Sequence, residues 1–144
     1  MNDAVFVDWG LKNEKYETFL YIGGSHGNEC ILSSLFGCHV SDGDFRSLSV
    51  AEFKECIADT AVVRLDVRTD EEYAEGHIAG AMNIDVLQPD FEQKSKAVLP
   101  KNKTIALYCR SGKRSKKAAR ILSELHYKVV ELDGGYMEWK QAGL

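Results

Sequence analysis

The sequence contains no apolar run of about eighteen residues, the length that a helix needs to cross a membrane. It also contains no internal repeat and no low-complexity segment. With 144 residues, the chain is long enough to bury one hydrophobic core without disulfides or a bound metal to stabilise it. We therefore expect a single main domain and no membrane span.

The chain has four cysteines, and their spacing excludes the common cysteine-based metal sites. The four cysteines include no C-x-x-C pair, and none stands at metal-ligand spacing from the four histidines, so we expect no zinc and no other metal. Cys56 falls on the apolar face of a predicted helix and is expected in the core. Cys30 and Cys38 could form a disulfide in an oxidising compartment, but nothing in the sequence favours a bridge over two free thiols.

The charge distribution argues against a nucleic-acid partner. The formal net charge is −4, and the 44% hydrophobic and 28% charged residues are ordinary for a soluble globular protein. The basic residues gather in one short stretch instead of forming a long stripe, and a long stripe is the usual footprint of nucleic-acid binding.

That basic stretch, Cys109–Ser115, is the segment around which we expect the chain to be organised. It follows the apolar run Thr104–Tyr108 and leads into a helical pattern. A strand, a turn containing Gly112 and a helix are typical of α/β proteins, which carry their sites at the carboxyl ends of strands. We therefore expect Cys109 at the mouth of this turn.

Cys109 is a candidate nucleophile because of its charged surroundings. The stretch from Cys109 to Arg120 contains no acid and six cations: Arg110, Lys113, Arg114, Lys116, Lys117 and Arg120. Nearby positive charge and the free N–H groups of a helix N-terminus both favour a thiolate, and successive N–H groups of the turn could form an anion-binding nest. The alternative is an inert buried thiol that ends a strand beside a solvated, charged helix face.

The rest of the chain predicts strands that alternate with helices. Capping boxes start two of the helices, at Ser49 with Glu52 and at Thr69 with Glu72. Alternation of this kind predicts right-handed crossovers and a mostly parallel sheet of four to five strands with helices on both faces. We expect helices at 50–58, 70–75, 90–98 and 115–125, a short helix carrying Trp139, and strands at 61–67, 82–84, 104–108 and 127–132. In the 115–125 helix, the side chains of Lys116, Lys117 and Arg120 are expected to be largely free.

Residues 1–46 form an N-terminal extension of unknown role, before the α/β domain at 47–144. Short strands are possible at 5–7 and 19–22, and His26 and His39 are expected on the surface. The run Ile31–Cys38 is similar to the end of a bacterial lipoprotein signal, but it lacks the basic leader. We expect a cytoplasmic protein, with an exported or lipid-anchored form as the alternative if Leu35–Cys38 is a processing site.

The loop and three further stretches resemble the rhodanese (sulfurtransferase) family. Cysteine phosphatases have a similar loop, with five residues between the cysteine and an arginine, whereas four residues separate Cys109 from Arg114. This shorter loop is similar to the rhodanese active-site loop. Three other stretches resemble further motifs of the family, in the family's order: Val63–Arg68 with Glu71–Tyr73, then Glu75–Ile84, then Leu132–Trp139. The resemblance covers about residues 48–142.

The resemblance implies transfer of sulfane sulfur through a persulfide on Cys109, without a cofactor. The donor would be an anion such as thiosulfate, and the acceptor a thiol or cyanide. The N–H groups of the loop would hold the persulfide, and Lys113 and Arg114, with Arg110, would attract the donor; the substrate-binding residues are thus Arg110, Ser111, Gly112, Lys113, Arg114 and Ser115. Asp66 and Arg68 would brace the loop or form a structural ion pair, whereas His77 is expected to be structural and Trp139 to lie in the core.

Three rival functions use the same fold. A phosphatase or arsenate reductase would need the longer loop. A persulfide relay to a protein partner, such as a thioredoxin-like or sulfur-relay protein, would keep the same chemistry at Cys109. A non-catalytic interaction module would normally lack the cysteine.

Overall fold

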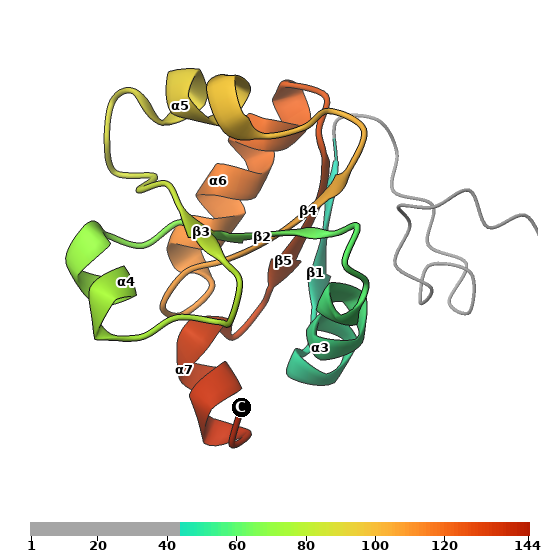
Figure 1. The fold of residues 1–144 in the computed structure, drawn as a ribbon, viewed down its shortest axis with the longest axis vertical. Coiled ribbons are helices and arrows are strands. Elements are labelled where there is room, and N and C mark those ends of the chain that lie inside the picture. The colour runs from blue at the N-terminus through green and yellow to red at the C-terminus, as the bar shows by residue number, and fades with distance from the viewer. Residues whose placement is uncertain (1–43) are drawn as a thin grey trace, which may run out of the picture.

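A five-stranded sheet forms the centre of the computed structural model, which describes residues 44–144 (Figure 1). All strand pairs are parallel, and the strand order is β1-β5-β4-β2-β3. The strands are β1 (Phe45–Leu48), β2 (Val63–Asp66), β3 (Met82–Asn83), β4 (Thr104–Tyr108) and β5 (Lys128–Leu132). The predicted mostly parallel α/β sheet is therefore confirmed.

Helices cover both faces of the sheet. The central strand β4 alternates its side chains between two apolar clusters, one on each face, and the helices bury these clusters. Ile105, Leu107 and Cys109 point to the face covered by α5 and α6, whereas Ala106 and Tyr108 point to the face covered by α3 and α7. The helices are α3 (Val50–Ala58), α4 (Asp70–Glu75), α5 (Phe91–Val98), α6 (Lys113–Glu124) and α7 (Gly135–Gln141). None of these helices is long and apolar enough to span a membrane.

The predicted helix starts are confirmed at both capping boxes. The Ser49 side chain accepts from the Glu52 N–H at the start of α3, and Thr69 does the same for Glu72 at the start of α4, with the glutamate side chain returning the contact in each case. Each cap satisfies backbone N–H groups that the first helical turn would otherwise leave unpaired. Local sequence alone therefore determines where these helices begin.

The structure adds one strand and moves one helix. The edge strand β1 starts at Phe45, which pairs with Val129 of β5, in a segment for which no strand is predicted from the sequence. Helix α6 starts at Lys113 instead of Ser115 because Gly112 takes a left-handed conformation, with φ at 88°, and turns the chain sharply after the loop.

Some sequence predictions concern residues outside the described part of the chain. These are the strands at 5–7 and 19–22, the histidines at 26 and 39, the cysteines at 30 and 38, and the lipoprotein-like run at 31–38. They stay predictions.

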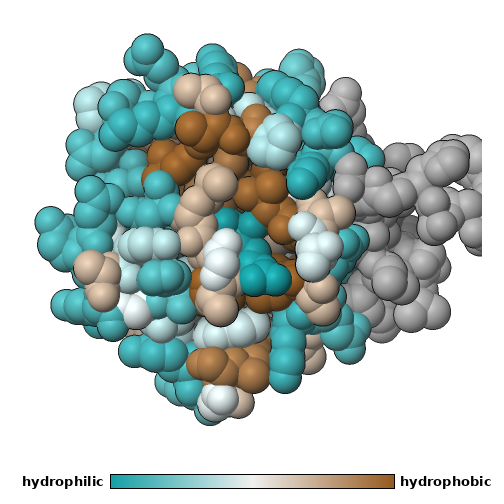
Figure 2. Space-filling model, in the orientation of Figure 1, coloured by the Kyte–Doolittle hydropathy of each residue, from teal (hydrophilic) through white to brown (hydrophobic). Residues whose placement is uncertain are grey.

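On the face drawn in Figure 2, hydrophilic residues cover most of the described surface, with smaller hydrophobic areas between them.

Candidate active site

Cys109 lies at the floor of its loop, not at the mouth as predicted. Its side chain is 1% exposed and belongs to the apolar cluster under α6, because it continues the alternation of β4. Its Sγ donates to the Ser115 Oγ at 3.5 Å. The thiol is free of disulfide bonding. Solvent therefore has almost no access to the sulfur.

The backbone of the loop leaves a row of N–H groups without acceptors. Among residues 44–144, no backbone or side-chain acceptor takes a hydrogen bond from the N–H groups of Arg110 to Ser115. The last three belong to the first turn of α6, where the partial positive charge of the helix is concentrated. Successive free N–H groups in a turn of this kind form a cradle for an anion.

The start of α7 holds the loop in place. The Tyr136 N–H donates to the Cys109 carbonyl at 2.8 Å, and the Met137 N–H donates to the Arg110 carbonyl at 3.0 Å. This contact requires Gly135, where φ is 65° and a Cβ atom would lie 2.6 Å from the backbone of Arg110. Gly112 is equally constrained, because its Cβ atom would lie 1.9 Å from the carbonyl oxygen of Asp133.

Arg114, the last cation of the predicted loop motif, is paired with Glu72. Its two terminal nitrogens donate to the two carboxylate oxygens of Glu72 at 2.6 and 2.8 Å. The hydrogen bond from Arg114, aided by the Thr69 N–H, lowers the pKa of Glu72 from 4.5 to about 2. The guanidinium thus joins the start of α6 to the start of α4 through a bidentate, charge-assisted contact.

Asp66 and Arg68 form a buried ion pair beside the loop. Arg68 donates to both carboxylate oxygens of Asp66, with a shortest distance of 2.6 Å, and to the Gly76 carbonyl at 2.6 Å. Burial opposes the charge of Arg68, but the hydrogen bond and charge of Asp66 outweigh it and raise the pKa of Arg68. Its guanidinium lies 4.3 Å from the centre of the Tyr136 ring, and Tyr136 in turn holds the Cys109 carbonyl.

Sequence reasoning missed Glu131, which lies behind the thiol and is 0% exposed. It accepts hydrogen bonds from the Ser115 Oγ at 2.8 Å and the Ser47 Oγ at 2.5 Å, and it pairs with the Lys116 Nζ at 2.9 Å. Ser115 therefore links the sulfur to a buried carboxylate. One signal could have revealed it, because Glu131 is the only acid in the otherwise apolar run from Val129 to Leu132.

The prediction that Lys116 is largely free is wrong, and the positive field at the loop is smaller than predicted. Lys116 pairs with Glu131 and, at 2.5 Å, with Asp133, because β5 and the turn after it run beside α6. Two of the six cations are thus neutralised by acids from distant segments. Within the described residues, Arg110 and Lys113 are the loop cations that stay exposed and without an acidic partner.

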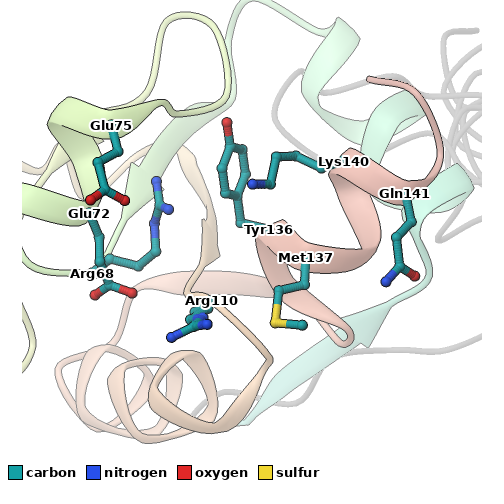
Figure 3. Close-up of a pocket in the computed structure, with 8 residues that line it drawn as sticks. All are labelled: Arg68, Glu72, Glu75, Arg110, Tyr136, Met137, Lys140 and Gln141. Atoms are coloured by element: carbon teal, nitrogen blue, oxygen red, sulfur yellow. The ribbon is translucent and has the colours of Figure 1, made fainter.

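A pocket of about 610 Å³ opens beside the loop (Figure 3). Figure 3 shows its walls, with α4 and the end of β2 on one side, α7 on the other, and Arg110 between them. Its lining residues are Arg68, Glu72, Glu75, Arg110, Tyr136, Met137, Lys140 and Gln141.

Two other residues singled out in the sequence have structural surroundings. His77 is exposed and stacks on Tyr73 with ring centres 3.8 Å apart, outside the lining of the pocket. Trp139 is 8% exposed and packs edge-on against Phe53 in the core, as predicted. Among the described residues, no group of three His, Cys, Asp or Glu side chains gathers to hold a metal ion.

Comparisons with known proteins agree with this geometry. Residues 49–142 match the family model of the rhodanese-like domain. The chain is 39% identical over 98 residues to the putative sulfurtransferase YtwF of Bacillus subtilis, covering 67% of this chain and 92% of that protein. It is 42% identical over 71 residues to the thiosulfate sulfurtransferase PspE of Escherichia coli, covering 49% of this chain and 67% of that protein. The crystal structure of a rhodanese-related protein from Thermoplasma volcanium superimposes with a TM-score of 0.61 at 35% identity, covering 68% of this chain and 93% of that one.

Proposed function

Because this chain belongs to the rhodanese-like domain family, we propose that it is a sulfurtransferase that carries sulfane sulfur as a persulfide on Cys109. The observation that carries the proposal is the row of N–H groups from Arg110 to Ser115, directly after Cys109, for which residues 44–144 supply no acceptor. A terminal persulfide sulfur is an anion, and these groups suit its charge without needing a metal.

The proposed reaction has two steps. The Cys109 thiolate attacks the outer sulfur of thiosulfate, a new S–S bond forms on Sγ, and the S–S bond of thiosulfate breaks as sulfite leaves with the electron pair. An acceptor thiolate or cyanide then attacks the terminal sulfur of the persulfide. The bond to Sγ breaks, and its electron pair returns to Cys109 as a thiolate.

Different loop residues have different roles in this proposal. Arg110 and Lys113 are exposed and attract the anionic donor, and the N–H groups between Arg110 and Ser115 hold the bound anion. Arg114 positions the loop through Glu72. Asp66 and Arg68 support the loop through Tyr136.

Phosphate chemistry has less support at this site. The loop has one residue fewer than the phosphatase spacing. The two terminal nitrogens of the Arg114 guanidinium, which would otherwise bind phosphate oxygens, donate to Glu72 instead. A single sulfur atom needs less room than a tetrahedral phosphate. We therefore place sulfur transfer ahead of phosphate hydrolysis.

Intact-mass analysis after incubation with thiosulfate tests the proposal. We expect the mass of one added sulfur, mapped to the peptide that contains Cys109 and removed by excess thiol. Cys109→Ser should fold normally, as judged by circular dichroism, and gain no sulfur at this peptide. A folded wild-type protein that gains no sulfur, or gains it only on another cysteine, would contradict the assignment.

Turnover assays separate enzyme from relay. We expect sulfite release that is sustained by cyanide or a small thiol. A protein that loads Cys109 but passes the sulfur to neither acceptor would instead be a persulfide relay to a protein partner.

A further inference from the structure

The pocket beside the loop is too large for the smallest acceptor and carries two charges, on Glu75 and Lys140, that the two proposed steps do not use. Its volume of about 610 Å³ would hold a molecule of many atoms, whereas cyanide has two. It adjoins the reactive loop directly, since Arg110 lines it and follows Cys109 in the chain. The Met137 N–H, from the opposite wall, holds the Arg110 carbonyl at 3.0 Å.

The charges of the pocket divide into paired and unpaired groups. Arg68 is paired with Asp66, and Glu72 is paired with Arg114, so neither has its charge available for a ligand. In the described part of the chain, no ion pair forms at the other two cations, Arg110 and Lys140. Both are exposed, and Lys140 lies 5.2 Å from the centre of the Tyr136 ring on the α7 wall.

We propose that this pocket binds the sulfur acceptor, and that the acceptor is a small thiol bearing a carboxylate, which Arg110 and Lys140 bind. The inference rests on the proposed function, because it concerns the second step. Guanidinium and ammonium groups are the side chains that bind carboxylates best, and the side chain of Met137, which is 44% exposed, offers apolar contact to the carbon chain of the thiol.

The pocket also has an acidic wall. Glu75 of α4 is exposed and lies across from α7 in Figure 3. An acceptor that carries an amino group as well as a carboxylate could therefore bind in one orientation only, with its carboxylate toward α7. In the transfer step, the acceptor thiolate bonds to the terminal sulfur, the bond from that sulfur to Sγ breaks, and the electron pair stays on Cys109.

A single-turnover comparison tests this inference. The protein is loaded with thiosulfate, loading is confirmed by mass, free donor is removed, and the loss of the added sulfur is timed with 3-mercaptopropionate, 2-mercaptoethanol or cysteamine. For each variant, the rate with the carboxylate thiol is divided by the rate with the neutral thiol, so that intrinsic thiol reactivities cancel between variants.

Lys140→Glu should lower this ratio about fivefold or more, since it removes one attractive charge and adds a repulsive one at a partly solvated site. The same variant should raise the corresponding ratio for cysteamine, and Lys140→Arg should keep the wild-type ratio. Lys117→Glu is the matched control, because it makes the same charge change at an exposed position of α6 outside the pocket and should leave both ratios unchanged.

Equal ratios in the wild type and in Lys140→Glu would overturn the inference, and so would an equal drop in Lys117→Glu, which would show a general effect of net charge. Both results presuppose normal loading of Cys109. Failure to load the wild-type protein would instead overturn the proposed function, so the two failures are distinguishable.

Discussion

The Ser115 hydroxyl has one proton and several neighbours that could accept it. The Gly112 carbonyl and a Glu131 oxygen each lie 2.8 Å from the Ser115 oxygen and accept from it. The Cys109 sulfur lies at 3.5 Å and donates to the Ser115 oxygen as a thiol, whereas as a thiolate it would accept. While Glu131 is charged, it competes with a thiolate for the Ser115 proton. A charged Glu131 would therefore disfavour a thiolate on Cys109, and this effect would oppose that of the cations of the loop.

Glu131→Gln should make Cys109 more reactive. The amide oxygen would stay toward Lys116 and Ser47, which donate, so the amide nitrogen would face Ser115 and donate to it. The Ser115 proton would then be free to stabilise a thiolate, and a nearby negative charge would be lost. We expect an alkylating reagent to modify Cys109 about threefold faster or more at pH 7 in this variant than in the wild type.

The control for this variant is Glu124→Gln, which neutralises an exposed acid at the end of α6 and should leave the rate of Cys109 alkylation unchanged. A slower or unchanged alkylation of Cys109 in Glu131→Gln would show that Ser115 does not connect the carboxylate to the sulfur.

At the scale of elements, the site depends on three junctions between the loop and its neighbours. Glu72 joins α4 to α6, the start of α7 holds the loop carbonyls, and the Asp133 turn packs against Gly112. Each junction joins segments that are far apart in the sequence. The loop is consequently shaped largely from outside, and its own residues contribute the turn at Gly112 and the hydrogen bond from Ser115 to the Gly112 carbonyl.

Glu72 should make stability depend on pH in the acid range. Its pKa is about 2 in the folded protein against 4.5 without the interactions, so its contribution is complete above about pH 4.5 and is lost as the pH falls toward 2. We expect Glu72→Gln to lower the free energy of unfolding by about 1–3 kcal/mol at pH 7 and by much less near pH 2.5. Urea unfolding at both pH values measures this difference.

Glu71→Gln is the control, because Glu71 is exposed on the same helix and should change neither value appreciably. A loss at Glu72 that is the same at both pH values would mean that the carboxylate charge does not stabilise the junction.

Gly112→Ala should damage the loop by a steric clash and not by backbone strain alone. Its φ is 88° and its Cβ atom would meet the Asp133 oxygen at 1.9 Å, whereas Gly143, with φ at 76°, has open space around its Cβ position. Gly143→Ala should therefore cost only the left-handed strain, about 1–2 kcal/mol. Thermal unfolding should show a clearly larger loss for Gly112→Ala, together with loss of sulfur loading. Equal losses of stability in the two variants would show that the loop accommodates a Cβ atom at position 112 without further destabilisation.

At the scale of the whole molecule, the sheet separates two apolar clusters, and the site lies where β2 and β4 end between them. Edge strand β1 belongs to this frame, since Phe45 packs against the first cluster and Ser47 donates to Glu131. The predicted boundary between residues 46 and 47 cuts this strand.

A chain that begins at Ser47 should consequently be less stable than one that begins at Asp44. The shorter chain loses the pairing of Phe45 with Val129 and the apolar contact of its ring, worth about 2 kcal/mol. Urea unfolding of the two chains side by side measures the difference. Equal stability would show that β1 is dispensable and that the boundary at 47 is correct.

The sequence by itself determined the features that depend on neighbouring residues. The capping boxes, the apolar alternation of β4, the order of helices and strands and the spacing of Cys109 and Arg114 are all local patterns, and local patterns suffice for the fold class and for the candidate nucleophile. Only the tertiary structure decided that Cys109 lies at the floor of the loop, that Glu72 pairs with Arg114, that Glu131 lies behind Ser115 and that β1 completes the sheet. The physical reason is that these contacts join side chains brought together by packing across the sheet, and the partner of a charge cannot be read from the residues beside it in the chain.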